Sequence, residues 1–148
     1  MVQAIRRGQN LRETMTTKVF LSGAIEGHEE YGSEWRKVAT HKLHLAGFDV
    51  LDPTNIVDVD FETPEEIAEK NLYLQKRADI LLVEYMIPDR QYIGTDFELA
   101  WAKMHGQPSV VFAAPQARSR VYLQYMATKL ASSMQDAIEY IAVNYPTN

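Results

Sequence analysis

Short apolar runs along the chain alternate with longer segments whose apolar residues recur at helical spacing. The runs have the length of buried strands, and the segments between them follow the period of an amphipathic helix. We therefore expect strands over 18–22, 48–51, 80–83, 108–112 and 127–130, and helices over 34–45, 63–77, 95–104 and from 133 onward. Strands that alternate with helices predict a parallel sheet with right-handed crossovers, so the fold class is an α/β sandwich.

Local signals support the helix boundaries. Thr63-Pro64-Glu65-Glu66 combines a capping threonine, a proline at the first helical position and a glutamate three residues after the cap. The segment 133–136, SMQD, is a second start of this kind, and Gly47 lies where a helix is expected to end. These residue types mark helix ends more firmly than periodicity alone does.

A single domain accounts for most of the chain. The sequence has 148 residues, which is enough to bury a real core. Residues 1–17 read as a polar leader that contains Arg6, Arg7 and Arg12, and neither strand nor helix periodicity is sustained there. We therefore expect the folded domain over residues 18–148.

Composition excludes several classes of function. The chain has no cysteine, which excludes disulfide scaffolds, zinc–thiolate sites and thiol nucleophiles. Its net charge is −5 and it has no basic run, which argues against a nucleic-acid polymer as partner but leaves small nucleotides open. The four histidines lack metal-ligand spacing, so no metal site is predicted. No apolar run is long enough to span a bilayer, and we expect no membrane partner and a cytoplasmic location.

Glu98 is the strongest candidate for a reactive group. The segment 94–102, GTDFELAWA, follows the strand 80–83 through a turn and opens a helix at the carboxyl edge of the sheet, where open α/β sheets bind ligands. Backbone amides there stabilise negative charge, so this carboxylate is suited to attack an electrophilic sugar carbon. A solvated glutamate that merely suits the helix dipole is the plainer alternative. The apolar neighbours Phe97, Leu99 and Trp101 instead predict a helix buried on most sides, where a carboxylate needs a reason.

The loop after the first strand is a candidate for ligand contact. Gly23, Ala24 and Ile25 are small or apolar, so a ligand can approach the backbone closely and meet its amides. The loop lacks the glycine spacing of a dinucleotide-binding turn, and no phosphate-binding lysine motif is present in the chain. An ordinary strand-to-helix turn explains the same residues.

Three aspartates are candidates for binding sugar hydroxyls, because a carboxylate accepts two hydrogen bonds from a diol. Asp79 precedes the third strand, and Asp89 and Asp96 flank the turn before Glu98. Asp96 can equally cap the helix, and Asp89 can equally shape the turn. Of the tyrosines that could wall a base-stacking site, only Tyr92 is placed near Glu98 by its position in the sequence.

Four segments together resemble the nucleoside 2-deoxyribosyltransferase family, which includes N-glycosidases that act on nucleoside 5′-monophosphates. They are VFLSGAI at 19–25, ADILLV at 78–83, GTDFELA at 94–100 and GQP at 106–108. The resemblance implies a flavodoxin-like three-layer sandwich with a five-stranded parallel sheet. It also implies cleavage or exchange of the N-glycosidic bond of a (deoxy)nucleoside or nucleoside monophosphate, without a metal or cofactor.

The resemblance assigns roles to individual residues. The family's glutamate nucleophile corresponds to Glu98, which would attack C1′ and form a glycosyl-enzyme intermediate that a second base or water then captures. Together with the loop and turn arguments, it predicts substrate contacts at Phe20, Gly23, Ala24, Ile25, Asp79, Asp89, Tyr92, Gly94, Thr95 and Asp96. Sites of this family are commonly completed by a neighbouring subunit, so we expect a homodimer or a higher homo-oligomer.

The chain departs from the family pattern at three positions. Asn71 stands where the family has an acid that protonates or orients the leaving base, and an amide cannot deliver that proton. Either Glu69, Asp79 or a loop carboxylate substitutes for this acid, or the base leaves with less assistance and the activity is reduced. Phe20 stands where members commonly carry a tyrosine near the nucleophile, so the hydroxyl that would hold Glu98 is expected to be missing. Tyr92 replaces one of the serines of phosphate-accepting members.

Two other functions remain open on these departures. The same site could belong to a nucleotide-binding module that does not turn its ligand over. The departures at Asn71 and Phe20 support this alternative. A glycosidase that cleaves the nicotinamide–ribose bond of NAD would use similar carboxylate chemistry. Release of a free base, of nicotinamide, or of neither distinguishes the three.

Overall fold

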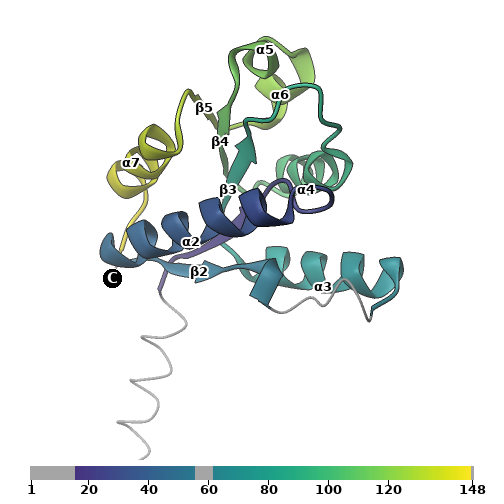
Figure 1. Cartoon of the computed structure of the whole chain (residues 1–148). Coiled ribbons are helices and arrows are strands. Elements are labelled where there is room, and N and C mark those ends of the chain that lie inside the picture. The colour runs from purple at the N-terminus through teal and green to yellow at the C-terminus, as the bar shows by residue number, and fades with distance from the viewer. Residues whose placement is uncertain (1–15, 56–61, 148) are drawn as a thin grey trace, which may run out of the picture.

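Five strands form one sheet in the order β2-β1-β3-β4-β5 (Figure 1). The computed structural model describes residues 16–55 and 62–147. The strands are β1 (Lys18–Ser22), β2 (Asp49–Leu51), β3 (Ile80–Tyr85), β4 (Ser109–Ala113) and β5 (Lys129–Ala131). The helices are α2 (Glu29–Leu45), η1 (Pro53–Asn55), α3 (Pro64–Arg77), α4 (Ile93–Met104), α5 (Pro115–Arg118), α6 (Val121–Met126) and α7 (Met134–Asn144).

Every pair of neighbouring strands in this sheet is parallel. The strand order is that of the flavodoxin-like doubly wound fold, in which the order reverses between the first and third strands. β1 and β3 are therefore adjacent, with Phe20 beside Leu81 and Ser22 beside Val83. The predicted α/β class, three-layer arrangement and five-stranded parallel sheet are confirmed.

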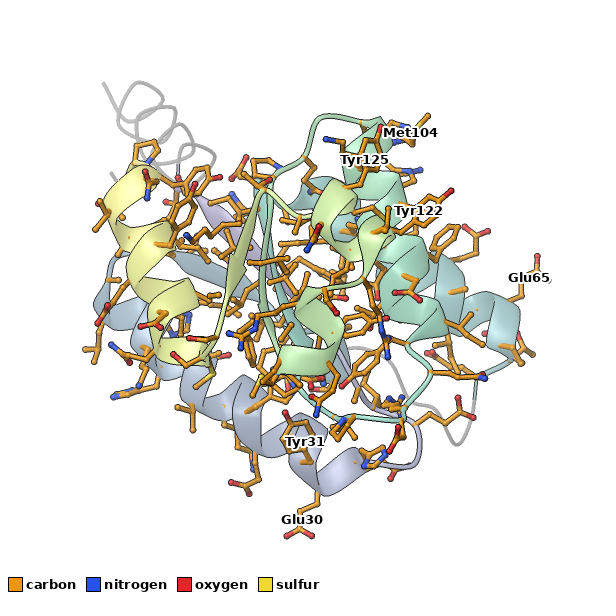
Figure 2. The ribbon with its side chains drawn as sticks, turned by 90° about the horizontal axis from the view of Figure 1, so that it is seen from above. Glu30, Tyr31, Glu65, Met104, Tyr122 and Tyr125 are labelled. Carbon is orange, nitrogen blue, oxygen red and sulfur yellow. The ribbon has the colours of Figure 1, made fainter. Side chains whose placement is uncertain are left out.

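Two hydrophobic cores lie on opposite faces of the sheet because successive side chains of a strand point to opposite sides. Val19 and Leu21 of β1 pack on one face with residues of α2 and α7, whereas Phe20 packs on the other face with residues of α3, α4 and α6. Figure 2 shows α2 and α7 on one side of the sheet and α3 and α4 on the other. The strands are buried on both faces, which is why they read as continuous apolar runs.

The predicted caps form as expected. The Thr63 side chain accepts a hydrogen bond from the Glu66 backbone N–H, and the Glu66 side chain accepts one from the Thr63 N–H. Ser133 accepts from the Asp136 N–H at the start of α7. Gly47, which has a φ of 94°, follows the end of α2. At each of these sites a local hydrogen bond or backbone conformation agrees with the tertiary fold.

Some boundaries differ from the sequence prediction. α2 begins at Glu29, five residues before the expected start at 34, and β3 continues to Tyr85 instead of ending at 83. β5 spans Lys129–Ala131 rather than 127–130, and the short helices α5 and α6 were not predicted. The sequence prediction ended β3 at 83 because Glu84 is polar. In the structure the Glu84 side chain is fully buried and hydrogen-bonded.

One expectation lies outside the described residues. The polar leader falls largely on residues 1–15, which lie outside the described residues, and the division of the chain at residue 17 stays a prediction. None of the helices described within 16–55 and 62–147 is long and apolar enough to cross a membrane.

Candidate active site

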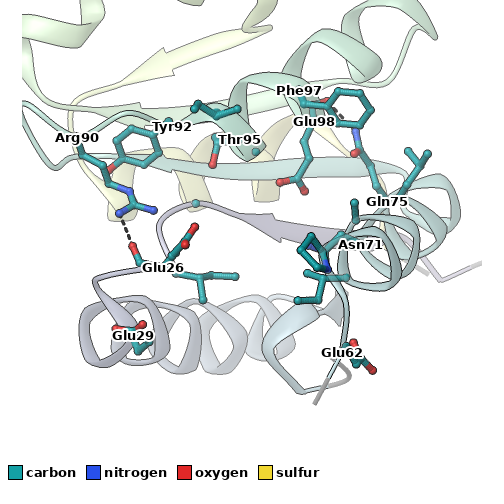
Figure 3. A pocket seen from close by; sticks show the side chains of 18 residues that line it. Glu26, Glu29, Glu62, Asn71, Gln75, Arg90, Tyr92, Thr95, Phe97 and Glu98 are labelled. Atoms are coloured by element: carbon teal, nitrogen blue, oxygen red, sulfur yellow. Dashed lines mark hydrogen bonds between the residues drawn. The ribbon is translucent and has the colours of Figure 1, made fainter. Parts of the chain in front are cut away.

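A cavity of about 720 Å³ opens at the carboxyl ends of β1 and β3, where the strand order of the sheet reverses. Its walls come from the loop after β1, the inner face of α3 and the first turns of α4 (Figure 3). The lining residues that carry the argument below are Gly23, Ile25, Asn71, Gln75, Tyr92 and Glu98. We call this space the main cavity.

Glu98 lies in the second turn of α4, and its carboxylate points into the main cavity (Figure 3). Its Oε1 accepts a hydrogen bond of 3.2 Å from the Ser22 hydroxyl at the end of β1. Burial raises the pKa of Glu98 to about 7, while the Ser22 hydrogen bond and the positive charge of Arg36 act in the opposite direction. The carboxylate is thus enclosed, oriented and able to change charge near neutral pH.

The enclosure of Glu98 does not come from burial of α4, and the expectation of a helix buried on most sides was wrong. Only Thr95, Leu99 and Ala102 of this helix are buried, whereas Ile93 is 73% and Phe97 58% exposed. α4 packs on the sheet along one stripe and leaves its other side open. Glu98 is enclosed by the end of β1 and by α3. The periodicity of apolar residues within α4 cannot predict contacts with these other elements.

α3 presents two amides to the main cavity on successive turns. Asn71 and Gln75 are four residues apart, so they lie on the same face of the helix and point toward Glu98 (Figure 3). The Gln75 Nε2 donates to the backbone carbonyl of Glu98 at 2.8 Å, which fixes α3 against α4. Asn71 Oδ1 is buried without a hydrogen-bond partner. A ligand in the main cavity would therefore meet an amide next to the carboxylate, not a second acid.

The structure brings together most of the residues expected from the motifs. Asn71 and Glu98 line the main cavity, and so do the expected substrate contacts Gly23, Ile25, Tyr92, Gly94 and Thr95. Ala24 is buried beside this group, and its N–H donates to the Glu84 carboxylate at 2.9 Å. Its amide is therefore already used within the protein.

Four expected contacts lie away from the main cavity. Phe20 shares the strand face of Ser22 but lies two residues before the carboxyl end of β1, where residues of α3 and α4 cover it and bury it fully in the core. Asp79 lies at the amino end of β3, the opposite edge of the sheet, where its Oδ2 accepts from the Lys18 N–H at 2.9 Å. Asp89 and Asp96 line a separate depression beside Arg120, and Asp96 accepts from the Tyr85 hydroxyl at 2.8 Å.

Sequence reasoning missed three residues of the site. Ser22 supplies the hydroxyl that Phe20 was expected to leave missing, so the prediction of an unheld Glu98 was wrong. Ser22 directly follows the apolar run of β1. A small polar side chain at a strand end is the one sequence feature that could have marked it as a site residue. Gln75 and Arg90 also line the main cavity, and Arg90 Nη1 donates to the Glu26 carbonyl across its end at 2.6 Å.

Among residues 16–55 and 62–147, no group of three or more histidine, aspartate or glutamate side chains is placed to hold a metal ion. The carboxylates along the main cavity come from Glu26, Glu29, Glu62 and Glu98. Arg90 is the only cationic residue among its described lining residues. The chemistry available at this site is that of one oriented carboxylate with neighbouring amides.

Known proteins resemble this chain in sequence and in fold. No family model matches the sequence. Over 100 residues the chain is 28% identical to the protein named Putative 2'-deoxynucleoside 5'-phosphate N-hydrolase 1 of Thermofilum pendens, an alignment that covers 65% of this chain and 67% of that protein. The chain is therefore similar in sequence to a protein named as an N-hydrolase.

Solved structures give the same result for the fold. The 2-desoxiribosyltransferase from Leishmania mexicana is similar with a TM-score of 0.71 and 16% identity, over 88% of this chain and 99% of that one. The 2-deoxyribosyltransferase from Bacillus psychrosaccharolyticus is similar with a TM-score of 0.65 and 20% identity, over 88% and 93%. These similarities establish the fold, and the reaction has to be argued from the site.

Proposed function

We propose that this protein is an enzyme that cleaves or exchanges the N-glycosidic bond of a (deoxy)nucleoside or nucleoside monophosphate, with Glu98 as the nucleophile. The observation that carries the proposal is the Glu98 carboxylate, held by Ser22 at 3.2 Å and aimed into a cavity of about 720 Å³. A cavity of this size is in the range of small-molecule sites. The N-hydrolase and the deoxyribosyltransferase to which the chain is similar are named for reactions at this bond, which supports the proposal.

The first step uses the ionised form of Glu98. One carboxylate oxygen attacks C1′ of the sugar, the bond between C1′ and the base nitrogen breaks, and its electron pair leaves with the base. The product is a glycosyl ester of Glu98. The Ser22 hydroxyl donates to Oε1 and thereby orients the carboxylate for attack by its other oxygen.

The second step restores the enzyme. A nitrogen of a second base or the oxygen of water attacks C1′, the ester bond to Glu98 breaks, and its electrons return to the carboxylate. Water must lose a proton in this step, and the released base must gain one. Transfer to a base gives exchange, and transfer to water gives hydrolysis.

The leaving base departs without a proton from Asn71. The amide can donate a hydrogen bond to an acceptor atom of the base, and Figure 3 shows it facing Glu98 across the main cavity. Asp79 is excluded as a substitute acid because it lies at the other edge of the sheet. Glu26, Glu29 and Glu62 are the remaining carboxyls along the cavity. We expect slower turnover than in an enzyme with an acid at position 71.

We also propose that the enzyme works as a homo-oligomer. α4 and α6 pack together and leave large apolar side chains exposed: Ile93, Phe97, Met104, Val121, Tyr122 and Tyr125. Figure 2 shows Met104, Tyr122 and Tyr125 at the surface. Ile93 and Phe97 also line the main cavity, so a second copy on this face would lie beside the substrate. Light scattering with a Tyr122→Glu variant tests this: the variant is expected to dissociate, and a monomeric parent protein overturns the proposal.

The activity is tested by incubating the purified protein with single deoxynucleosides, ribonucleosides and their 5′-monophosphates, with and without an acceptor base. Chromatography is expected to detect free base or an exchanged nucleoside, and Glu98→Gln is expected to abolish both. The absence of product from every substrate, with the Glu98 variant unchanged, overturns the proposal. The cytoplasmic location expected from the sequence remains part of this proposal.

A binding module is the second candidate, because Asn71 leaves the site without an acid beside the nucleophile. Saturable nucleotide binding by calorimetry without product would favour it. Release of nicotinamide from NAD would instead identify the NAD-cleaving glycosidase. Both outcomes come from the same purified protein and distinguish the three functions.

A further inference from the structure

Glu84 is a fully buried carboxylate at the carboxyl end of β3, behind the wall of the main cavity. Its Oε1 accepts from the Ala24 N–H at 2.9 Å, and its Oε2 accepts from the Tyr92 hydroxyl at 2.7 Å. The Met86 N–H and the Tyr31 hydroxyl also donate to Oε2, at 2.8 and 3.1 Å. Four donors hold this carboxylate in one position, because leaving a buried carboxylate or a buried donor without a hydrogen bond costs free energy.

One of these hydrogen bonds fixes the loop after β1. The loop approaches Glu84 so closely that a Cβ at Gly23 would lie 2.8 Å from the Glu84 Cβ. On its other side, the buried Arg36 guanidinium donates to the carbonyls of Gly23 and Ala24 at 3.2 and 3.1 Å. The Ala24 peptide is thus held by a negative charge at its N–H and a positive charge at its carbonyl. Ser22, whose hydroxyl contacts Glu98, immediately precedes this segment.

A second hydrogen bond fixes the start of α4. Tyr92 is the residue before the first turn of this helix, and its hydroxyl donates to Glu84 while accepting from the Ile87 N–H at 3.1 Å. These two contacts close the loop between β3 and α4, in which Asp89 has a φ of 62°. The helix that carries Glu98 therefore begins from a position set by Glu84.

From these contacts we propose that Glu84 is a positioning residue, which sets both sides of the Ser22–Glu98 contact from a single carboxylate. The proposal rests on the proposed function only for its consequence in catalysis, since the contact itself is a property of the folded protein. Glu84 does not line the main cavity, so it acts through Ala24 and Tyr92 and not on the substrate.

The charges around Glu98 allow a test that distinguishes two effects of Glu84 on the pKa of Glu98: the effect of its negative charge and the effect of its positioning of the Ser22–Glu98 contact. Arg36 of α2 lowers the pKa of Glu98, as does the Ser22 hydrogen bond, and α3 faces it with the neutral amides of Asn71 and Gln75. Glu84 itself faces Tyr31, Tyr92 and Arg36. Removing the negative charge of Glu84 can by itself only lower the pKa of another carboxyl, whereas loss of the Ser22 contact raises it.

The experiment measures the pKa of Glu98 by ¹³C NMR of its side-chain carboxyl in the unliganded protein. Glu84→Gln and Tyr92→Phe are both expected to raise this pKa by about half a unit or more, because each loosens one side of the contact. Ser22→Ala is expected to raise it in the same direction, and Glu84→Gln added to Ser22→Ala is expected to give no further rise. Tyr31→Phe is the matched control: it removes one donor to Glu84 that supports neither side, and no shift is expected.

An unchanged or lowered pKa in both Glu84→Gln and Tyr92→Phe overturns the proposal. If Glu84→Gln does not fold, Tyr92→Phe decides, because it leaves the carboxylate and its other three donors in place. A merely destabilising role would lower the melting temperature without moving the Glu98 titration. The readout needs no turnover, so it stands apart from a failure to release any base, which would overturn the proposed function instead.

Discussion

The Ser22 hydroxyl and the Glu98 carboxylate are separated by 76 positions in the sequence and by 3.2 Å in the structure. Ser22 ends β1 and Glu98 lies on α4, so their contact depends on the parallel pairing of β1 with β3 and on the way α4 returns over the sheet. This contact gives the carboxylate a defined orientation. It also opposes the rise in its pKa that burial causes.

The rate of base release should rise with pH through the titration of Glu98. Burial raises the pKa of this group to about 7, and only its ionised form can attack C1′. We expect kcat/KM to increase up to about pH 7 and then to level off, with no loss at higher pH from Asn71, which does not titrate. A pH profile with deoxynucleosides checks this. A rate that falls between pH 6 and 8 would contradict it.

Ser22→Ala should shift that profile to higher pH. The variant loses the Ser22 hydroxyl that donates to Glu98, and a hydrogen bond to a charged group is worth enough to move a pKa by about one unit. At pH 6 the variant should therefore be about tenfold slower, and the difference should shrink at pH 8.5. Ser33→Ala, at a serine that does not contact Glu98, is the control, and an identical profile for Ser22→Ala would contradict the prediction.

Glu98→Gln should remove activity while leaving the fold intact. We expect a loss of at least about 10³-fold in kcat, because an amide cannot form the glycosyl ester. The raised pKa means that the folded protein binds a proton at Glu98 more tightly than the unfolded chain. Wild-type stability should thus fall as pH rises from 4.5 to about 7, and the variant should lack this fall. Denaturant unfolding at pH 5 and 8 measures the difference.

Asn71→Asp should speed departure of the base. Two neighbouring carboxyls at positions 71 and 98 would not both ionise near neutral pH, so one would keep a proton for the leaving group. We expect a gain of up to about 10²-fold in single-turnover base release. Asn71→Leu should show no gain. A decrease for the aspartate variant to the level of the leucine variant would show that position 71 does not face the base.

Asp79→Ala should affect stability and not activity. Its carboxylate accepts from the Lys18 N–H at the amino ends of the strands, on the other edge of the sheet from the main cavity. Loss of this hydrogen bond should cost about 1 kcal/mol of unfolding free energy. The kcat/KM of the folded variant should match that of the wild type. A large loss of activity at unchanged stability would contradict this prediction and indicate that Asp79 contacts the substrate.

Local sequence signals predicted the helix starts well. Thr63 and Ser133 cap their helices with contacts to residues three positions away, so the cause of each start lies within the segment itself. β3 was cut short at Val83 for the opposite reason. Glu84 continues the strand because donors from three other parts of the chain satisfy its carboxylate, and those donors are invisible in the sequence around it.

The candidate site divides in the same way. Asp79 and Phe20 belong to segments that resemble the family, yet one lies at the far edge of the sheet and the other in the core. Asp79 precedes β3 at the amino edge of the parallel sheet, and Phe20 lies two residues before the carboxyl end of β1 under α3 and α4. The sequence resemblance does not record how far a residue lies from the carboxyl edge or which helices cover it. Ser22 was missed because a hydroxyl at a strand end has meaning only once α4 is placed above it.

By itself, the sequence determined the alternation of strands and helices, the absence of thiol chemistry and the position of Glu98 at the start of a helix. These follow from periodicity, composition and capping, which act over a few neighbouring residues. Only the tertiary structure decided that the Ser22 hydroxyl contacts this carboxylate and that Gln75 contacts the Glu98 backbone carbonyl. It also decided that Glu84 holds the Ala24 N–H beside the Ser22 end of β1. The reason is physical: burial and hydrogen bonding of an ionisable group depend on segments that meet only when the sheet has formed.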